Sequence, residues 1–168
     1  VNRSVSGWLF MFAGAAVSWA VRAQNTPALS SAEAELYGLS TAVCDLLVCV
    51  NVLEEMGFVV ASPVTVLSDS RGARLLVADC AAAARTRHIH RRWFFVEFYS
   101  DDKFGERRLR VVPVKGVDNH ANFLTKPVGG EAFSLNRAYS LGVRAPDPEA
   151  VRRALEHVRA ANSAPAVA

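Results

Sequence analysis

The N-terminal part of the chain is strongly apolar and changes its pattern part-way along. Residues 8–12 form a short apolar run rich in aromatic side chains, which is typical of a buried strand. Residues 17–22 instead alternate between apolar and polar side chains, as a strand with one solvent-facing side does. Small residues at 13–15 separate the two runs, so the pattern predicts a β-hairpin. The uncharged stretch 4–21 also meets the minimum length of a transmembrane helix, which is the alternative interpretation.

A helical pattern follows the hairpin. Apolar residues recur every three or four positions between residues 36 and 53. Ser30 is a favourable N-cap, and Glu33 follows it by three residues, which together form a capping box. Gly57 is a typical residue at the C-terminal end of a helix. The sequence therefore predicts one long helix between Ser30 and Gly57.

The rest of the chain alternates short strands with helices. One strand is expected over residues 64–67 and another over 107–114, where Leu109 and Val111 alternate with arginines. This order predicts an α/β fold whose strand directions are mixed, because the hairpin is antiparallel. Further helices are expected over residues 71–77, 85–98, 118–124, 131–139 and 148–159, followed by a disordered tail over 160–168.

Composition narrows the class of protein. The chain has 168 residues, of which 51% are hydrophobic and 21% charged, and this excludes a disordered or fibrous chain. A formal net charge of +3 permits a nucleic-acid partner without requiring one. The three cysteines show no CxxC spacing, so neither a disulfide framework nor a zinc site is expected, and a reducing compartment is the simplest interpretation. We expect Cys44 and Cys49 to pack in the core.

Several short motifs occur in a defined order along the chain. The early ones are Arg3-Ser4-Val5-Ser6-Gly7-Trp8, Val17-Ser18-Trp19, Gln24 and Ala28-Leu29-Ser30-Ser31-Ala32-Glu33-Ala34-Glu35-Leu36-Tyr37. The later ones are Ser68-Asp69-Ser70, Thr86-Arg87-His88-Ile89 and Asp118-Asn119-His120-Ala121-Asn122-Phe123-Leu124-Thr125-Lys126-Pro127. Together these motifs resemble the ribonuclease H domain of copia-type LTR retrotransposons. The resemblance covers about residues 3–141.

The resemblance implies a fold, a reaction and partners. The implied fold is ribonuclease H-like, a mixed five-stranded sheet with helices on both faces, here over residues 1–141 and followed by a C-terminal helix and disordered tail over 142–168. The implied reaction is hydrolysis of the RNA strand of an RNA–DNA hybrid. The implied partners are that hybrid and the reverse transcriptase domain of the same polyprotein, with no membrane, in the cytoplasm or nucleus.

The same resemblance implies a catalytic site that binds Mg²⁺ through carboxylates. Glu35 matches the family's helix carboxylate, Asp69 the strand-end carboxylate and Asn122 the late helical carboxylate. Mg²⁺ prefers such oxygen ligands, and a pair of these ions activates water and neutralises the phosphate. The residues alone also allow structural roles. Glu35 would then be a solvated first-turn acid favoured by the helix dipole, and Asp69 the N-cap of a following helix.

Two departures from the family pattern weaken the expected metal site. Asn122 is an amide where the family has an acid, so it keeps an oxygen ligand and loses the negative charge. Asp118 lies one helical turn earlier and is a possible substitute. The family's first carboxylate lies on a central strand upstream of the motif at 3–8, which this sequence does not contain. We therefore expect Mg²⁺ binding to be weak or lost, and the hairpin and the 64–67 strand to lack a common neighbour.

Basic and aromatic residues around 85–95 leave their roles open. The resemblance implies nucleic-acid contacts at Ser70, Arg71, Arg87 and His88, and arginines in this region suit phosphates. The alternative is a solvated basic helix face. The aromatic run 93–95 is expected in the core.

Three classes of function remain. They are an active or weakly active nuclease, a catalytically dead domain that binds nucleic acid or reverse transcriptase, and a small membrane-anchored or secreted protein built on residues 4–21.

Overall fold

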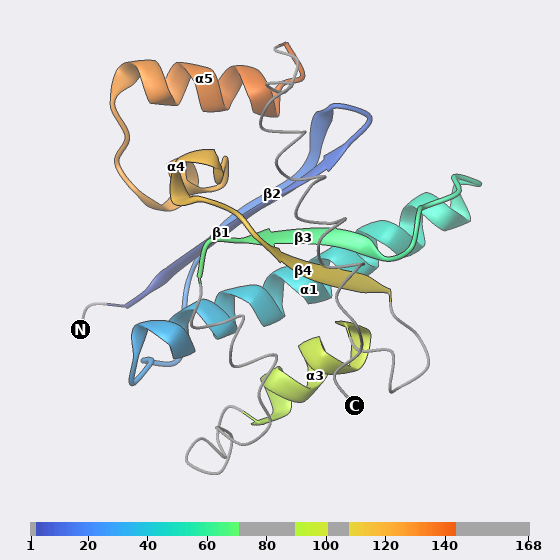
Figure 1. The fold of residues 1–168 in the computed structure, drawn as a ribbon, viewed down its shortest axis with the longest axis horizontal. Helices are drawn as coiled ribbons and strands as arrows, with labels where there is room; N and C mark the ends of the chain where they lie inside the picture. Colours follow the sequence, from blue (N-terminus) through green and yellow to red (C-terminus); the bar gives the residue numbers. More distant parts are fainter. Residues whose placement is uncertain (1–2, 71–89, 101–107, 144–168) are drawn as a thin grey trace.

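The computed structural model describes residues 3–70, 90–100 and 108–143 (Figure 1). The helices expected over 71–77 and 148–159, the tail over 160–168 and the first part of the 85–98 helix lie outside these residues. The described part is a mixed α/β fold with two small sheets and several helices.

The N-terminal segment forms the predicted hairpin. Strands β1 (Val5–Phe12) and β2 (Ala15–Ala23) pair in antiparallel register. Ala13 and Gly14 join them with φ angles of 51° and 88°, the pair of positive values that a tight type I′ turn requires. Trp8 on one face is only 5% exposed, whereas Trp19 on the other face is 63% exposed. The period-two pattern therefore identified the strands, but not the buried face of β2, because its apolar residues Val17, Trp19 and Val21 are exposed.

The long helix also follows its prediction. Helix α1 spans Ser31–Glu55, and the hydroxyl of Ser30 accepts a hydrogen bond from the Glu33 N–H at 3.1 Å. The Glu33 carboxylate in turn accepts a bond from the backbone N–H of Leu29 at 2.7 Å, so the capping box closes one residue earlier than in its usual form. Gly57 ends the helix with a φ of 87°.

The other two strands form a separate sheet. Strand β3 (Val64–Ser68) pairs in parallel with β4 (Leu109–Pro113). Among the described strands, the hairpin and the β3–β4 pair share no ladder, and β1 and β3 each keep one unpaired edge. This separation agrees with the expectation that the hairpin and the strand at 64–67 lack a common neighbour. The five-stranded sheet implied by the resemblance is accordingly not formed by these strands.

Helices cover the strands from two sides. Figure 1 shows α1 and α3 (His90–Ser100) on one side of the strands, with α4 (Asn122–Thr125) and α5 (Gly130–Ser140) on the other. The core joins α1, α3 and β4 through Leu39, Val43, Val96 and Leu109, which are all buried. This side packs tightly because the apolar stripe of α1 faces both the second helix and the parallel pair.

The C-terminal region departs from its prediction. The expected helix over 118–124 is two short turns, a 3₁₀ turn at Gly116–Asp118 and α4 at Asn122–Thr125. The break occurs because the Asn119 side chain accepts a hydrogen bond from the Ala121 N–H at 3.1 Å, which competes with the helix. The helix expected over 131–139 is present as α5 (Gly130–Ser140).

Some burial predictions are wrong. Cys44 is exposed and Cys49 is half-buried, because both lie to the side of the α1 stripe that faces the core. In β4, Val112 is buried although it lies opposite the face of Leu109 and Val111, since this strand packs on both faces. Phe94 is 47% exposed, so the aromatic run at 93–95 is not wholly core.

The segment proposed as a transmembrane helix is not helical. Residues 4–21 form the hairpin rather than a helix. Within the described ranges, α1 alone is long and apolar enough to span a membrane by length and composition, a test that the core helix of a soluble protein also passes.

Candidate metal and nucleic-acid site

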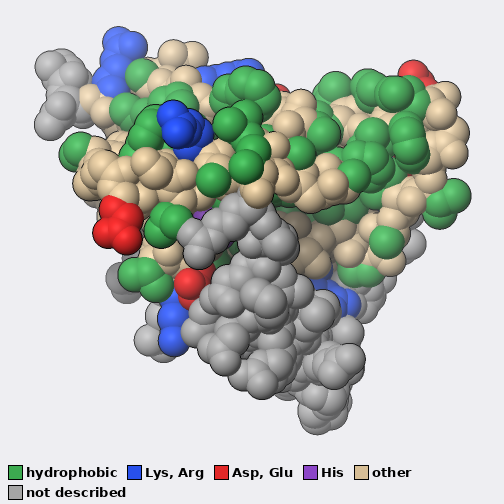
Figure 2. All heavy atoms as spheres, turned by 90° about the horizontal axis from the view of Figure 1, so that it is seen from above, with side chains coloured by type: hydrophobic (Ala, Val, Ile, Leu, Met, Phe, Trp, Pro, Cys, Tyr) green, Lys and Arg blue, Asp and Glu red, His purple; other side chains and the backbone are tan. Residues whose placement is uncertain are grey.

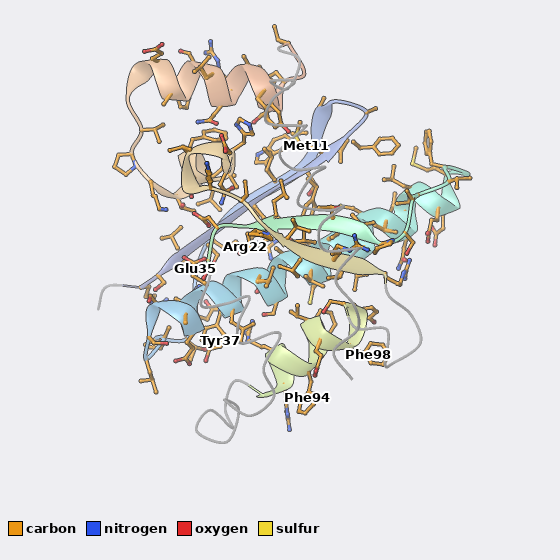
Figure 3. The ribbon with its side chains drawn as sticks, in the orientation of Figure 1. Met11, Arg22, Glu35, Tyr37, Phe94 and Phe98 are labelled. Carbon is orange, nitrogen blue, oxygen red and sulfur yellow. The ribbon has the colours of Figure 1, made fainter. Side chains whose placement is uncertain are left out.

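Glu35 stands apart from the capping machinery two residues earlier on α1. Glu33 is 2% exposed and accepts hydrogen bonds from the Leu29 N–H and, at 2.6 Å, from the Tyr37 hydroxyl. Glu35 points to a different side of the helix, because two residues correspond to about 200° of helical rotation. Figure 3 shows Glu35 near the start of α1, beside the end of β3.

Asp69 follows the last residue of β3, as predicted. Its Oδ1 atom accepts a hydrogen bond from the side-chain amide of Asn119 at 3.1 Å. Ser70 comes next and donates its backbone N–H to the Ser68 hydroxyl at 3.3 Å. The N-cap role considered for Asp69 involves a helix at 71–77, which lies outside the described residues.

Asn122 reaches the same place from the start of α4. Its amide nitrogen donates to the Gly116 carbonyl at 2.7 Å, and its Oδ1 accepts from the Lys126 ammonium at 3.3 Å. A methyl group added at Gly116 would lie 3.6 Å from Asp69 Oδ2 and 4.0 Å from the Asn122 amide nitrogen. Gly116 therefore lies between the two side chains, and its lack of a side chain leaves the space between them open.

Glu35 interacts electrostatically with Asp69 and Lys126. Partial desolvation of its carboxyl raises the pKa of Glu35, although the residue as a whole is exposed. The charge of Asp69 raises that pKa further, while the Lys126 ammonium lowers it. Two carboxylates that repel each other beside one cation are an arrangement that a bound dication would relieve. We call Glu35, Asp69, Asn122 and Lys126 the carboxylate cluster.

The cluster suits one hard cation better than a pair. The atoms of Glu35, Asp69 and Asn122 that can ligate a metal ion are all oxygen atoms, which Mg²⁺ prefers. Only two of them are carboxylates, and both polar atoms of Asn122 already have partners. No group of three or more His, Cys, Asp or Glu side chains gathers anywhere in the described part of the chain.

The sequence motifs located some of this site and missed the rest. Glu35, Asp69 and Asn122 come together, and Ser70 lies beside them. Asn119, Gly116 and Lys126 were not singled out, although two of them lie within the motif at 118–127 that carried the resemblance. The implied nucleic-acid residues Arg71, Arg87 and His88 lie outside the described residues.

Comparison with known proteins gives this geometry a context. The chain is 32% identical over 134 residues to a Pol polyprotein from transposon TNT 1-94 of Nicotiana tabacum, described as retrovirus-related. It is 29% identical over 140 residues to the corresponding proteins from transposons RE2 and RE1 of Arabidopsis thaliana. The matches cover 80% of this chain in the first case and 83% in the other two. The chain is homologous to part of retrotransposon Pol polyproteins.

This Pol-related chain corresponds to a small piece of its relatives. It spans 10% of the tobacco polyprotein and 9% of each Arabidopsis one. No family model matches it. No solved structure matches it either.

Proposed function

We propose that this chain is the ribonuclease H-type part of a retroelement Pol polyprotein. The carboxylate cluster is its Mg²⁺ site with fewer carboxylates than the family has, and the substrate is the RNA strand of an RNA–DNA hybrid. With an amide at Asn122 and two carboxylates, we expect weak cleavage or none.

The convergence of three distant residues supports this proposal. Glu35 comes from a helix, Asp69 from the end of a strand and Asn122 from a later helical turn. Burial raises the pKa of Glu35, and the charge of Asp69 raises it further across these elements. Carboxylates that repel one another at a strand end are a typical feature of a ligand site in an open α/β fold.

The same geometry explains why activity is expected to be weak. Asn122 contributes no negative charge, and its oxygen is bonded to Lys126. That ammonium supplies part of the charge compensation that a metal ion would otherwise supply. When bound, Mg²⁺ would be held chiefly by Glu35 and Asp69 and would supply charge neutralisation at a phosphate.

A second candidate function is binding without cleavage, to nucleic acid or to another part of the polyprotein. Hydrophobic side chains cover much of the face that carries α5 (Figure 2). Phe133 and Leu135 of α5 are 44% and 42% exposed, and Trp19 of β2 is 63% exposed. Large exposed apolar side chains of this kind are typical of surfaces that contact another protein.

One assay distinguishes these candidates. A labelled RNA–DNA hybrid is incubated with the full chain in Mg²⁺ or in EDTA, and both cleavage and salt-dependent binding are measured. The first candidate predicts slow Mg²⁺-dependent cleavage that Asp69→Asn abolishes and Asn122→Asp increases. Glu131→Gln is the matched control, because Glu131 is also an exposed first-turn acid, in α5. Hybrid binding without cleavage in any variant would instead support the second candidate.

A further inference from the structure

A cavity separate from the carboxylate cluster opens between the hairpin, α1 and α3. Its volume is about 250 Å³. Arg22 near the end of β2 and Arg92 of α3 supply two guanidinium groups to its wall, and Thr26 supplies a hydroxyl. The Thr41 hydroxyl also lines the cavity, but it donates to the Tyr37 carbonyl at 2.9 Å. None of the described residues that line it is acidic. Arg22 also forms an ion pair with Asp45 at 3.3 Å, so the described lining together with Asp45 carries one net positive charge.

The two guanidinium groups are held in place by aromatic rings. Arg22 lies over the Trp8 ring at 5.2 Å, and Arg92 lies over the Tyr37 ring at 4.8 Å. Figure 3 shows Arg22 on the side of α1 that faces the strands and Tyr37 on the side that faces α3. Both rings are themselves buried, so they orient the arginines and leave no face on which a base would stack.

Two buried polar atoms at this cavity lack partners. Among the described residues, neither Trp8 Nε1 nor Gln24 Oε1 has a hydrogen-bond partner, although Trp8 is 5% exposed. Both side chains line the cavity. The Gln24 amide nitrogen, in contrast, is fixed by bonds to the Ser6 hydroxyl at 2.8 Å and the Ala34 carbonyl at 2.7 Å. A buried donor and a buried acceptor that both lack partners are costly unless a ligand or water meets each of them.

We propose that this cavity binds the phosphate group of a nucleotide. The arginines and the Thr26 hydroxyl suit a phosphate, which is one of the anions whose geometry matches a guanidinium group. The indole N–H of Trp8 supplies a further donor. The carbonyl oxygen of Gln24 accepts a hydrogen bond from a hydroxyl of the same nucleotide. This site does not rest on the carboxylate cluster and requires no metal ion.

Titration of the full chain with phosphate ligands tests this assignment in EDTA. Inorganic phosphate and AMP are titrated by calorimetry, and the Trp8 indole signal is followed by NMR after assignment with Trp8→Phe. We expect both ligands to bind and to shift that signal. The double variant Arg22→Gln, Arg92→Gln should lower the affinity for AMP at least about tenfold, because two charge-assisted contacts are lost.

The matched control is Arg137→Gln. Arg137 also lies over an aromatic ring, that of Phe133 at 6.0 Å, but on α5. This variant should keep AMP affinity within about twofold, since it removes the same charge from elsewhere. Equal affinity in the wild type and the double variant, or an equal loss in Arg137→Gln, would overturn the proposal.

Two further arms complete the design. If circular dichroism shows that the double variant is unfolded, the AMP affinity of Thr26→Val is measured instead. We expect that affinity to fall about threefold or more. An unchanged affinity would overturn the proposal. An oligoribonucleotide without terminal phosphates then identifies the source of the ligand. Displacement of AMP indicates a nucleic-acid strand, and no displacement indicates a free nucleotide. Failure of hybrid cleavage would leave this binding result unaffected.

Discussion

The two glutamates near the start of α1 lie in contrasting surroundings. Glu33 is 2% exposed, and its carboxylate accepts bonds from the Leu29 N–H and the Tyr37 hydroxyl. Glu35 is exposed and lies beside Asp69, which repels it. The first carboxylate is held by two hydrogen-bond donors, whereas burial and the charge of Asp69 raise the pKa of the second. The contrast separates a residue that holds the fold from one that is suited to bind a cation.

Removal of Glu33 should have the largest effect on stability. Glu33→Ala leaves the Leu29 N–H and the Tyr37 hydroxyl without their acceptor, and we expect a loss of about 2–4 kcal/mol in the free energy of unfolding. Urea denaturation monitored by circular dichroism measures it. Glu33→Gln keeps an acceptor and should lose less. A loss below that of Glu35→Ala would reverse the assignment of the two roles.

Asp69→Asn should have the largest effect on metal binding. The amide keeps the shape and can still accept from Asn119, so the fold should persist while one of two anionic ligands is lost. We expect Mg²⁺ affinity to fall about tenfold, as measured by calorimetry. Glu131→Gln should leave it unchanged. An unaltered affinity in Asp69→Asn would mean that the ion binds elsewhere.

Asn122→Asp should act in the opposite direction. It adds a third carboxylate beside Glu35 and Asp69, and we expect Mg²⁺ affinity to rise about fivefold. Without metal, the new charge faces the Gly116 carbonyl, so a loss of about 1 kcal/mol in stability is expected. Thermal denaturation with and without Mg²⁺ compares the two effects. A variant that Mg²⁺ fails to stabilise more than the wild type would contradict this expectation.

Glu35→Gln should give the smallest change in the free energy of unfolding, and the size of that change should depend on pH. The folded chain raises the pKa of Glu35 above its ordinary value of 4.5, so the folded state binds this proton more tightly than the unfolded state. Stability from this group is therefore lost as the pH rises through the raised pKa. Since the residue is exposed, we expect the variant to gain less than about 1 kcal/mol at neutral pH.

Melting curves of the wild type and Glu35→Gln from about pH 3.5 to about pH 7 measure this gain. The difference in Tm should be near zero in acid and reach about 1–3 °C at neutral pH. A variant that is less stable at neutral pH would show that the Glu35 charge stabilises the fold.

Local patterns in the sequence predicted the local structure well. The alternation at 17–22 and the small residues at 13–15 identified the hairpin, and Ser30 with Glu33 identified the start of α1. These features depend on neighbours in sequence. The resemblance implied Glu35, Asp69 and Asn122 as site positions, whereas the residues alone favoured a first-turn acid role for Glu35 and left an N-cap role equally open for Asp69.

Contacts between distant residues were the part that could not be predicted. The helix expected over 118–124 breaks at Asn119, whose side-chain oxygen accepts from the Ala121 N–H and whose amide nitrogen donates to Asp69, 50 residues earlier. The charged cavity joins Arg22 to Arg92 across three elements, and no local pattern signals such a meeting.

The central claim is that Glu35 and Asp69 share one electrostatic site. It is tested most directly by measuring the pKa of Glu35 by NMR in the wild type, in Asp69→Asn and in Glu131→Gln. The account predicts a raised pKa in the wild type, a clear fall when the Asp69 charge is removed and no change in the control. A Glu35 pKa that is the same in all three proteins would show that the two carboxylates do not interact.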